Sequence, residues 1–305
     1  MSYPKTVKLN SGFEIPLCGL GTCATKDPEQ IVYDSIKAGI RLFDTALFYK
    51  NEEEIGKGLE RALADKLCKR EELFIITKIW PTHYEKVEET MKSQLKSLRI
   101  DYVDLYLLHW PLRVFNEKGE IQRIPTHVLW KDMENLVKKG YTKSIGVSNF
   151  SVQILLDMLT YCEIPPAVNE VEFHPYHGRI ELLNFCNKFN IKVIAYNSLV
   201  SGGYVRDNEN YKIFENKTII ELSQKYKKTE GQIILNFAAS QGVITIPKSD
   251  KVNRVVENYS NLEFRLEEED LKKLLLLDEG KIFCKDVANP NIDLFKNFNG
   301  VFPFA

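Results

Sequence analysis

The stretch LFDTALFYKNEEEIG, residues 42–56, decides how this chain is interpreted. It opens with an apolar pair suited to a buried strand and passes through Asp44 and Thr45 where that strand is expected to end. It then reaches Tyr49, just before a helix expected from Asn51. In α/β proteins, chemistry concentrates at the carboxyl ends of parallel strands. An acid and a phenol at one strand end therefore mark a candidate site, provided that other strands contribute to it.

The overall composition argues against several classes of partner. The chain has 305 residues, of which 44% are hydrophobic, enough for a large core. Its 41 basic and 42 acidic residues nearly balance, so the chain lacks the excess of positive charge that favours binding to nucleic acid. Six cysteines without a CxxC pair, no signal peptide and no membrane-spanning apolar run indicate a reducing compartment. We expect a cytoplasmic monomer with one domain over residues 1–305, without nucleic-acid or membrane partners.

Eight short apolar segments alternate with longer amphipathic ones. We interpret as strands the segments PLCGLGT, LFDTA, LFIITKI, VDLYLLHW, TKSIGVSN, AVNEVEF, KVIAYNSL and VITIPKS. Buried strands separated by helices predict a parallel sheet, and eight such units predict an α/β fold closed into a (β/α)8 TIM barrel. The alternative is an open doubly wound sheet. Against it, Gly19-Leu20-Gly21 is not followed by the third glycine of a dinucleotide-binding motif, and we interpret it as a tight turn.

The connecting segments are predicted from their periodicity and length. Helices are expected over residues 27–38, 51–64, 84–98, 128–139, 151–161, 180–189 and 229–240. Residues 7–17, VKLNSGFEIPL, predict a β-hairpin covering one end of the barrel. Residues 111–127, 200–216 and 281–305 are too long for simple connectors and are predicted to be substrate-binding loops and a C-terminal tail. We expect the tail to pack onto the barrel through Phe283, Phe295, Phe298, Phe302 and Phe304.

Polar residues also end the two strands that follow. Lys78 lies near the end of LFIITKI, and because a buried lysine is costly unless paired, Asp44 is its expected partner. A cation near Tyr49 would stabilise the phenolate, which makes the phenol a usable proton donor. His109 ends the next strand and can hydrogen-bond a substrate oxygen when neutral. Each residue alone has an ordinary explanation, such as a helix cap, a solvated lysine or a core histidine, but together they indicate a site.

With these residues in place, the sequence resembles the aldo-keto reductase family. The motifs that carry the resemblance are residues 43–56, TKIW at 77–80, DLYLLHWP at 104–111, GVSNF at 146–150, VEFHPY at 171–176 and IPKS at 246–249, with Arg254 and Asn258. The resemblance implies a catalytic tetrad of Asp44, Tyr49, Lys78 and His109. It implies reduction of aldehydes and ketones, sugar aldehydes included, with Tyr49 as general acid. The substrate walls are expected to be Phe48, Trp80 and Trp110, beside His109.

The resemblance also implies a nicotinamide cofactor held without a Rossmann domain. It assigns Ser148 and Asn149 to the carboxamide and Tyr196 to stacking on the nicotinamide ring. It assigns Lys248, Ser249 and Arg254 to the 2′-phosphate of NADPH and Asn258 to the adenine. Further cofactor contacts are implied for Thr22, Asp44, Glu170, Ser198 and Leu199. No metal is expected.

Asp250 complicates the choice between NADPH and NADH. A carboxylate beside a phosphate is repulsive, whereas it can accept a hydrogen bond from a free 2′-hydroxyl. We therefore expect NADPH to be preferred, with some use of NADH.

Two residues depart from the family pattern. Glu170 stands where the family usually has Gln, and it adds negative charge near a ring that is positive when oxidised. This predicts that NADP⁺ binds more tightly relative to NADPH than it does in Glu170→Gln. Cys23 stands where Trp is common, which predicts a wider substrate pocket, and we expect Cys23 itself to be buried and inert rather than reactive.

Two other functional classes stay open. Barrels of this family also serve as channel accessory subunits and lens proteins, so the chain could bind cofactor without turnover. The tetrad argues against this, because a structural role gives no reason to keep a buried Lys78. An unrelated barrel isomerase would instead bind a substrate phosphate at strands seven and eight. Cofactor titration and turnover of a simple aldehyde separate these classes.

Overall fold

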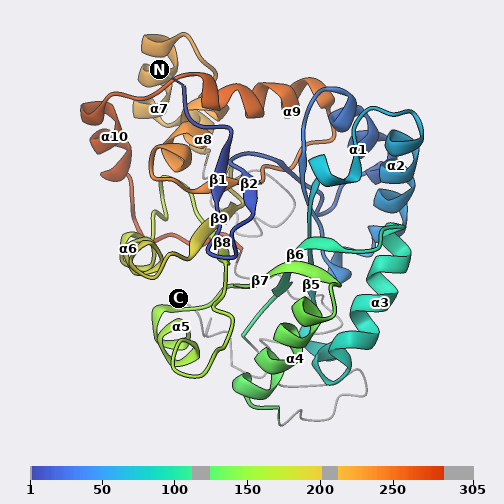
Figure 1. Ribbon diagram of the computed structural model, residues 1–305. Coiled ribbons are helices and arrows are strands. Elements are labelled where there is room, and N and C mark those ends of the chain that lie inside the picture. Colours follow the sequence, from blue (N-terminus) through green and yellow to red (C-terminus); the bar gives the residue numbers. More distant parts are fainter. Residues whose placement is uncertain (1, 112–123, 201–211, 285–305) are drawn as a thin grey trace.

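The strands form a closed parallel barrel. The structure, a computed structural model, describes residues 2–111, 124–200 and 212–284 (Figure 1). In the main sheet each strand pairs in parallel with the next in sequence, in the order β3 (Leu20–Gly21), β4 (Leu42–Asp44), β5 (Phe74–Ile79), β6 (Val103–Leu108), β7 (Thr142–Ser148), β8 (Val168–Glu172), β9 (Lys192–Tyr196) and β10 (Ile244–Thr245). Parallel bridges from Cys18 to Thr245 and from Gly21 to Lys248 join the last strand to the first. This closure confirms the predicted (β/α)8 barrel and excludes the open sheet.

Helices surround the barrel (Figure 1). Seven overlap the predicted segments: α1 (Pro28–Lys37), α2 (Glu52–Ala64), α3 (Val87–Leu98), α4 (Thr126–Lys138), α5 (Val152–Met158), α6 (Ile180–Lys188) and α8 (Glu230–Ser240). Short 3-10 helices are η1 (Leu47–Tyr49), η2 (Arg70–Glu72), η3 (Pro81–Lys86), η4 (Ile213–Glu215) and η5 (Ser260–Glu263). No bounds were predicted for three more helices: α9 (Val252–Tyr259) follows the last strand, β10, whereas α7 (Lys217–Tyr226) and α10 (Glu268–Leu275) are additional to the alternation of strand and helix. None of the described helices has the length and apolar character needed to cross a membrane.

Local sequence explains where the first helix begins and ends. The Asp27 side chain accepts a hydrogen bond from the Gln30 amide at 3.1 Å, and Pro28 occupies the first helical position. Both features favour a helix start, because the first amides lack partners within the helix. Gly39 follows the last turn with φ of +97°, a conformation that glycine adopts without steric cost.

The N-terminal hairpin closes one end of the barrel, as predicted. Strands β1 (Thr6–Lys8) and β2 (Glu14–Pro16) pair antiparallel and lie over the centre of the ring of helices (Figure 1). The hairpin packs Leu9 and Ile15 against residues at the start of the strands, among them Leu42 and Phe74. The site predicted at the strand ends therefore lies at the opposite end of the barrel.

Alternation along the strands separates two layers of core. Side chains of a strand point alternately to its two faces. Inward positions such as Leu42, Ile76 and Leu105 pack together inside the barrel. Outward positions such as Phe43 and Ile75 pack against the surrounding helices. The inner layer near the hairpin is mostly apolar, with Ser144 as a polar exception whose hydroxyl bonds Ser11 Oγ at 2.7 Å, and the buried charged residues Asp44, Lys78 and Glu170 lie toward the carboxyl ends.

The Gly19-Leu20-Gly21 segment is part of a strand, so its interpretation as a tight turn is wrong. Leu20–Gly21 is strand β3, and the Gly19 amide donates to the Thr245 carbonyl at 2.9 Å. A Cβ atom at Gly21 would lie 2.5 Å from the Ile246 carbonyl oxygen. Glycine is needed here because two backbones approach closely where the barrel closes.

Much of the predicted loops and tail lies outside the described residues. These parts are residues 112–123, 201–211 and 285–305, including Phe295, Phe298, Phe302 and Phe304. Of the tail phenylalanines, Phe283 is described, and its side chain is buried against the core as expected.

Candidate functional site

The predicted tetrad converges because its residues continue the inward positions of their strands. Counting by two from inward Leu42 on β4 reaches Asp44, and from Ile76 on β5 it reaches Lys78. The same count from Leu107 on β6 reaches His109. The 3-10 helix η1 follows β4 directly and ends at Tyr49. Period-two alternation thus brings these side chains to one end of the barrel interior.

Lys78 is the centre of the cluster. Its Nζ atom lies 2.5 Å from Asp44 Oδ2 and 3.1 Å from the Thr45 carbonyl oxygen, which confirms the predicted ion pair. The same Nζ atom donates to the Tyr49 hydroxyl at 3.5 Å. Lys78 is fully buried and Asp44 is 2% exposed. An ammonium beside the phenol oxygen stabilises a negative charge there, as general-acid chemistry would require.

Glu170 joins this cluster from the far side of the barrel. Its Oε1 atom lies 3.2 Å from Lys78 Nζ, and the side chain is 1% exposed. The resemblance had assigned this residue only to the cofactor. Strands β6 and β7 separate β5 from β8 in the sheet, so the contact forms across the barrel interior. Lys78 therefore forms ion pairs with two carboxyl groups.

Burial and mutual charge set the protonation of these groups. Burial, followed by the nearby Asp44, raises the pKa of Glu170 to about 8. Burial also raises the pKa of Asp44, against the opposing effect of Lys78. For Lys78, burial opposes the charge, but the two carboxyl groups outweigh it and raise the lysine pKa. Burial, with a smaller contribution from Lys78, holds the pKa of His109 well below its usual range, so this imidazole is neutral at physiological pH.

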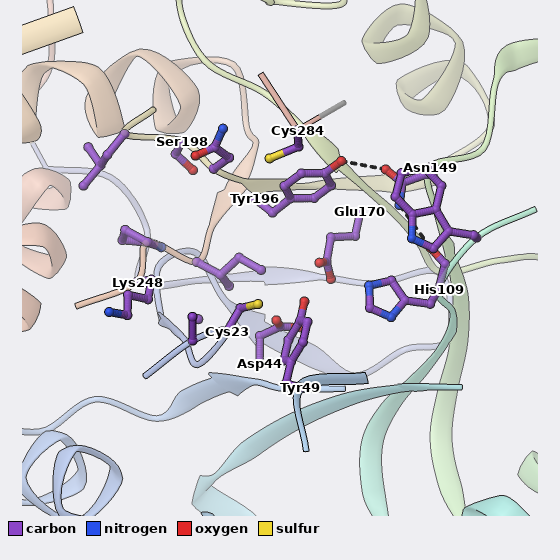
Figure 2. Close-up of a pocket in the computed structure, with 17 residues that line it drawn as sticks. Cys23, Asp44, Tyr49, His109, Asn149, Glu170, Tyr196, Ser198, Lys248 and Cys284 are labelled. Atoms are coloured by element: carbon purple, nitrogen blue, oxygen red, sulfur yellow. Dashed lines mark hydrogen bonds between the residues drawn. The ribbon is translucent and has the colours of Figure 1, made fainter. Parts of the chain in front are cut away.

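A cavity of about 360 Å³ opens above the cluster. Its lining includes ten residues predicted for catalysis, cofactor or substrate: Asp44, Tyr49, His109, Trp110, Asn149, Glu170, Tyr196, Ser198, Leu199 and Lys248. Figure 2 shows Tyr49 and Tyr196 on opposite sides of this space, with Glu170 and His109 between them. This volume and mixed lining are typical of a small-molecule site.

A chain of hydrogen bonds fixes the upper wall of the cavity. The Tyr196 hydroxyl donates to Asn149 Oδ1 at 2.8 Å (Figure 2). Asn149 Nδ2 donates to the His109 carbonyl at 3.0 Å and to Ser148 Oγ at 3.0 Å. Ser148 Oγ in turn donates to the Glu170 carbonyl at 2.9 Å. Asn149, Tyr196 and the backbone of His109 are thereby held in one orientation.

Aromatic residues pack beside His109. The rings of Phe48 and Trp80 stack with centroids 4.0 Å apart, and Trp80 meets the His109 ring edge-on at 5.0 Å. Trp110 lines the cavity, whereas Phe48 and Trp80 are not among its described lining residues. The imidazole Nδ1 atom of His109 is buried and has no hydrogen-bond partner among the described residues.

Lys248, predicted to bind the 2′-phosphate, forms an ion pair with Asp250. The Lys248 ammonium donates to Asp250, whose other oxygen accepts from the Lys26 amide at 2.9 Å. Partial burial opposes ionisation of Asp250, but these hydrogen bonds outweigh it and hold its pKa below the usual value. Ser249 precedes helix α9, which carries Arg254 on an exposed position. Lys248 lines the cavity at the side away from His109 (Figure 2).

Five other predicted cofactor residues do not line the described cavity. The Thr22 hydroxyl donates to the Asp44 carbonyl at 2.8 Å, beneath the pocket floor. Asn258 is buried on α9, and its carbonyl accepts from Cys18 Sγ at 3.9 Å. Ser148, Ser249 and Arg254 also fall outside the described lining. Their assignments to a cofactor remain predictions.

The sequence patterns did not identify Cys284 as a cavity residue. Cys284 lines the pocket although it is far along the chain from every other lining residue. It is held there by buried Glu172, whose carboxylate accepts from the Phe283 amide at 3.1 Å and the Cys284 amide at 3.0 Å. No periodic pattern marks such a contact. Cys23, expected to be buried, is half-buried and faces the cavity, because its segment follows β3 at the open end of the barrel.

Known proteins resemble the chain over nearly its whole length. It is 37% identical over 301 residues to the NAD(P)H-dependent D-xylose reductase of Pyricularia oryzae, covering 90% of this chain and 93% of that protein. It is 35% identical over 302 residues to aldose reductase C of Dictyostelium discoideum, covering 92% of each.

Solved structures agree in fold. The Bombyx mori aldo-keto reductase, solved in complex with NADP, superposes with a TM-score of 0.85 at 31% identity, covering 93% of this chain and 95% of that one. The aldose reductase of Schistosoma japonicum gives a TM-score of 0.83 at 32% identity, covering 92% and 94%. Residues 19–279 match the model of the Aldo/keto reductase family. Together with the barrel and the convergent cluster, this shows that the chain belongs to the aldo/keto reductase family.

Proposed function

We propose that the protein is an NADPH-dependent reductase of aldehydes and ketones, sugar aldehydes among them. The observation that carries the proposal is the convergence of a phenol, a buried ammonium and a neutral imidazole at one cavity. The relatives named as D-xylose and aldose reductases support a carbonyl substrate. A purely structural role would leave the burial of Lys78 without a purpose.

Each residue has a defined task in this reaction. A reduced nicotinamide supplies the hydride when bound. Tyr49 donates its hydroxyl proton to the carbonyl oxygen, and Lys78 stabilises the phenolate that this leaves. Asp44 keeps Lys78 charged and oriented. Neutral His109 orients the substrate oxygen through a hydrogen bond, while Trp110 forms an apolar wall that excludes water.

The lining of the cavity fits such a cofactor. The Tyr196 ring borders the cavity, and its hydroxyl is fixed by Asn149 at 2.8 Å, so the ring is preorganised for stacking. The same cavity reaches Lys248, a cation suited to a phosphate. We assign these residues, with Ser148, Ser249, Arg254 and Asn258, to cofactor binding.

The proposal is tested with a panel of aromatic, aliphatic and sugar aldehydes, following loss of NADPH absorbance. We expect turnover of several members and quenching of protein fluorescence when NADPH is titrated alone. Binding without any turnover would favour a cofactor-binding protein instead. Failure to bind NADPH or NADH would refute the proposal.

Asp250 is expected to limit the preference for NADPH. In Asp250→Asn the repulsion of the 2′-phosphate disappears and Lys248 becomes free to bind it. The ratio of kcat/KM for NADPH to that for NADH should rise about tenfold, equivalent to ~1.4 kcal/mol. Initial rates with both cofactors at saturating aldehyde measure this ratio.

The matched control for Asp250→Asn is Glu263→Gln. It removes one negative charge from the exposed end of η5, outside the described cavity lining, and should leave the ratio unchanged. An unchanged ratio in Asp250→Asn would show that its carboxylate does not select the cofactor. Equal kcat/KM values for the two cofactors in the native protein, or higher values with NADH, would contradict the proposed preference.

We further propose a cytoplasmic monomer with a single catalytic domain over residues 1–305. Six free cysteines support a reducing compartment, where disulfides are rare. Light scattering of the purified protein measures the oligomeric state.

A further inference from the structure

Glu170 gives this site one more acid than Lys78, the buried cation that the described residues place there, can balance. Lys78 Nζ contacts Asp44 Oδ2 at 2.5 Å and Glu170 Oε1 at 3.2 Å. All three residues are at most 2% exposed. With both acids ionised, the cluster would carry a net charge of −1 away from water. Burying an unbalanced charge is unfavourable, so the arrangement favours keeping a proton on one of the acids.

Both acids lie against the same ammonium. Lys78 Nζ is 2.5 Å from Asp44 Oδ2 and 3.2 Å from Glu170 Oε1, which places the two carboxyl groups close to each other. Two buried carboxyl groups at one site oppose each other's ionisation, so the arrangement favours one protonated and one ionised partner. Glu170 Oε2 is buried, and no described residue donates a hydrogen bond to it. The proton therefore belongs to the pair rather than to one residue.

The surrounding groups do not supply the missing positive charge. Besides Asp44 and Lys248, the titratable groups that line the described cavity with Glu170 are Cys23, Tyr49 of η1, His109 after β6, Tyr196 of β9 and Cys284, and none of them is a cation. Burial lowers the pKa of His109 and raises the pKa of Tyr196, so both are neutral at physiological pH. Lys248 lies at the far side of the cavity and is paired with Asp250. Near neutral pH, burial and Asp44 bring the pKa of Glu170 to about 8, so the shared proton is still present there.

We propose that the Asp44 and Glu170 pair carries one proton in the free protein and releases it when the oxidised cofactor binds. The inference rests on the proposed function, which assigns the cavity to a nicotinamide cofactor. The step is an acid ionisation: the carboxyl O–H bond breaks, its electron pair stays on oxygen and the proton passes to the solvent. The oxidised ring brings a positive charge that stabilises the resulting carboxylate. The neutral reduced ring brings none, so NADPH leaves the proton in place.

Calorimetry tests the proton release directly. NADP⁺ and NADPH are each titrated into the protein at pH 7 in two buffers that differ in ionisation enthalpy. We expect NADP⁺ to release about one proton more than NADPH, and this difference should vanish in Glu170→Gln. Both forms carry the same 2′-phosphate, so its protonation cancels in the difference. Equal release by the two forms in the native protein would overturn the inference.

The affinities should show the same linkage. Below the pKa of the pair, NADP⁺ binding displaces a proton, so its Kd should fall by up to about tenfold for each unit of rising pH. The Kd of NADPH should change only through ionisation of the 2′-phosphate, which both forms share and which cancels in the ratio of their Kd values. Between pH 6 and pH 8 the ratio of the two Kd values should change at least tenfold in the native protein and less than about twofold in Glu170→Gln. A ratio with the same pH dependence in both proteins would contradict the proposal.

The matched control is Glu52→Gln. Glu52 is also a buried glutamate whose pKa is raised by burial, and it lies behind Lys78. Its Oε1 atom accepts from Thr77 Oγ1 at 2.6 Å and from Gln94 Nε2 at 2.7 Å, and it does not line the described cavity. This variant should keep the difference in proton release. If the difference in proton release disappeared in Glu52→Gln but not in Glu170→Gln, the proton would be assigned to Glu52.

The free protein offers a readout without cofactor. An acid whose pKa is raised on folding destabilises the fold increasingly as pH rises from its unfolded pKa to its folded pKa. Glu170→Gln removes this effect, so its Tm should exceed that of the native protein more at pH 8 than at pH 5. An equal Tm difference at both values would oppose the shared proton. If neither NADP⁺ nor NADPH binds, the proposed function fails; if both bind with equal proton release, only this inference fails.

Discussion

Replacing Tyr49 with phenylalanine is expected to lower kcat for aldehyde reduction by roughly a hundred- to ten-thousand-fold, the range usual for a lost general acid. The hydroxyl that disappears is the one that accepts a hydrogen bond from Lys78 at 3.5 Å. Neither Lys78 nor His109 replaces it efficiently as a proton donor, because Lys78 is held by two carboxyl groups and a neutral imidazole is a weak acid. Steady-state kinetics with NADPH and a reactive aromatic aldehyde measure the loss.

Cofactor binding separates loss of chemistry from loss of structure. The Tyr49→Phe variant keeps the ring, so the Kd of NADPH from fluorescence titration should stay within a few-fold of the native value. Tyr33→Phe is the matched control, since its hydroxyl bonds exposed Asp65 at 2.7 Å, outside the site. That variant should retain full activity. Tyr49→Phe turning over within tenfold of the native rate would remove Tyr49 from the role of proton donor.

Replacing Lys78 with methionine is expected to destabilise the protein by about 3–5 kcal/mol near pH 8, the usual effect of removing one partner of a buried ion pair. The change leaves Asp44 and Glu170 as buried acids without a cation. The loss should shrink as pH falls toward 5, because both carboxyl groups can then take up protons. Urea unfolding at the two pH values measures it, and reductase activity should fall as well.

Two further variants identify the cause of this instability. Lys78→Met with Asp44→Asn leaves a single acid, which can stay protonated, so most of the stability should return without activity. Lys143→Met removes a half-exposed lysine that lies 2.9 Å from Asp104, an acid that keeps its bond to Arg70. That change should cost about 1 kcal/mol or less. Native-like stability of Lys78→Met at pH 8 would mean that the acids do not depend on the lysine.

The sequence alone determined the barrel and three of the four tetrad positions at the strand ends. Asp44, Lys78 and His109 are recoverable because a strand has a strict period of two and a parallel barrel gathers its carboxyl ends at one face. Tyr49 follows Asp44 closely in the chain and therefore lies at the same end of the barrel. The hairpin was also predictable from its turn residues, because the interactions that define a hairpin are local.

Only the tertiary structure decided which titratable groups lie close enough to affect each other's protonation. Glu170 reaches Lys78 from three strands further round the barrel, and that contact exists only because the sheet curls and brings the two side chains within 3.2 Å across its interior. Cys284 enters the cavity because Glu172 binds the backbone amides there, and no side-chain pattern records such bonds. Asp250 meets the Lys26 amide in the same way. Local periodicity thus determined where each strand ends, whereas burial and distances across the barrel decided the protonation of the site.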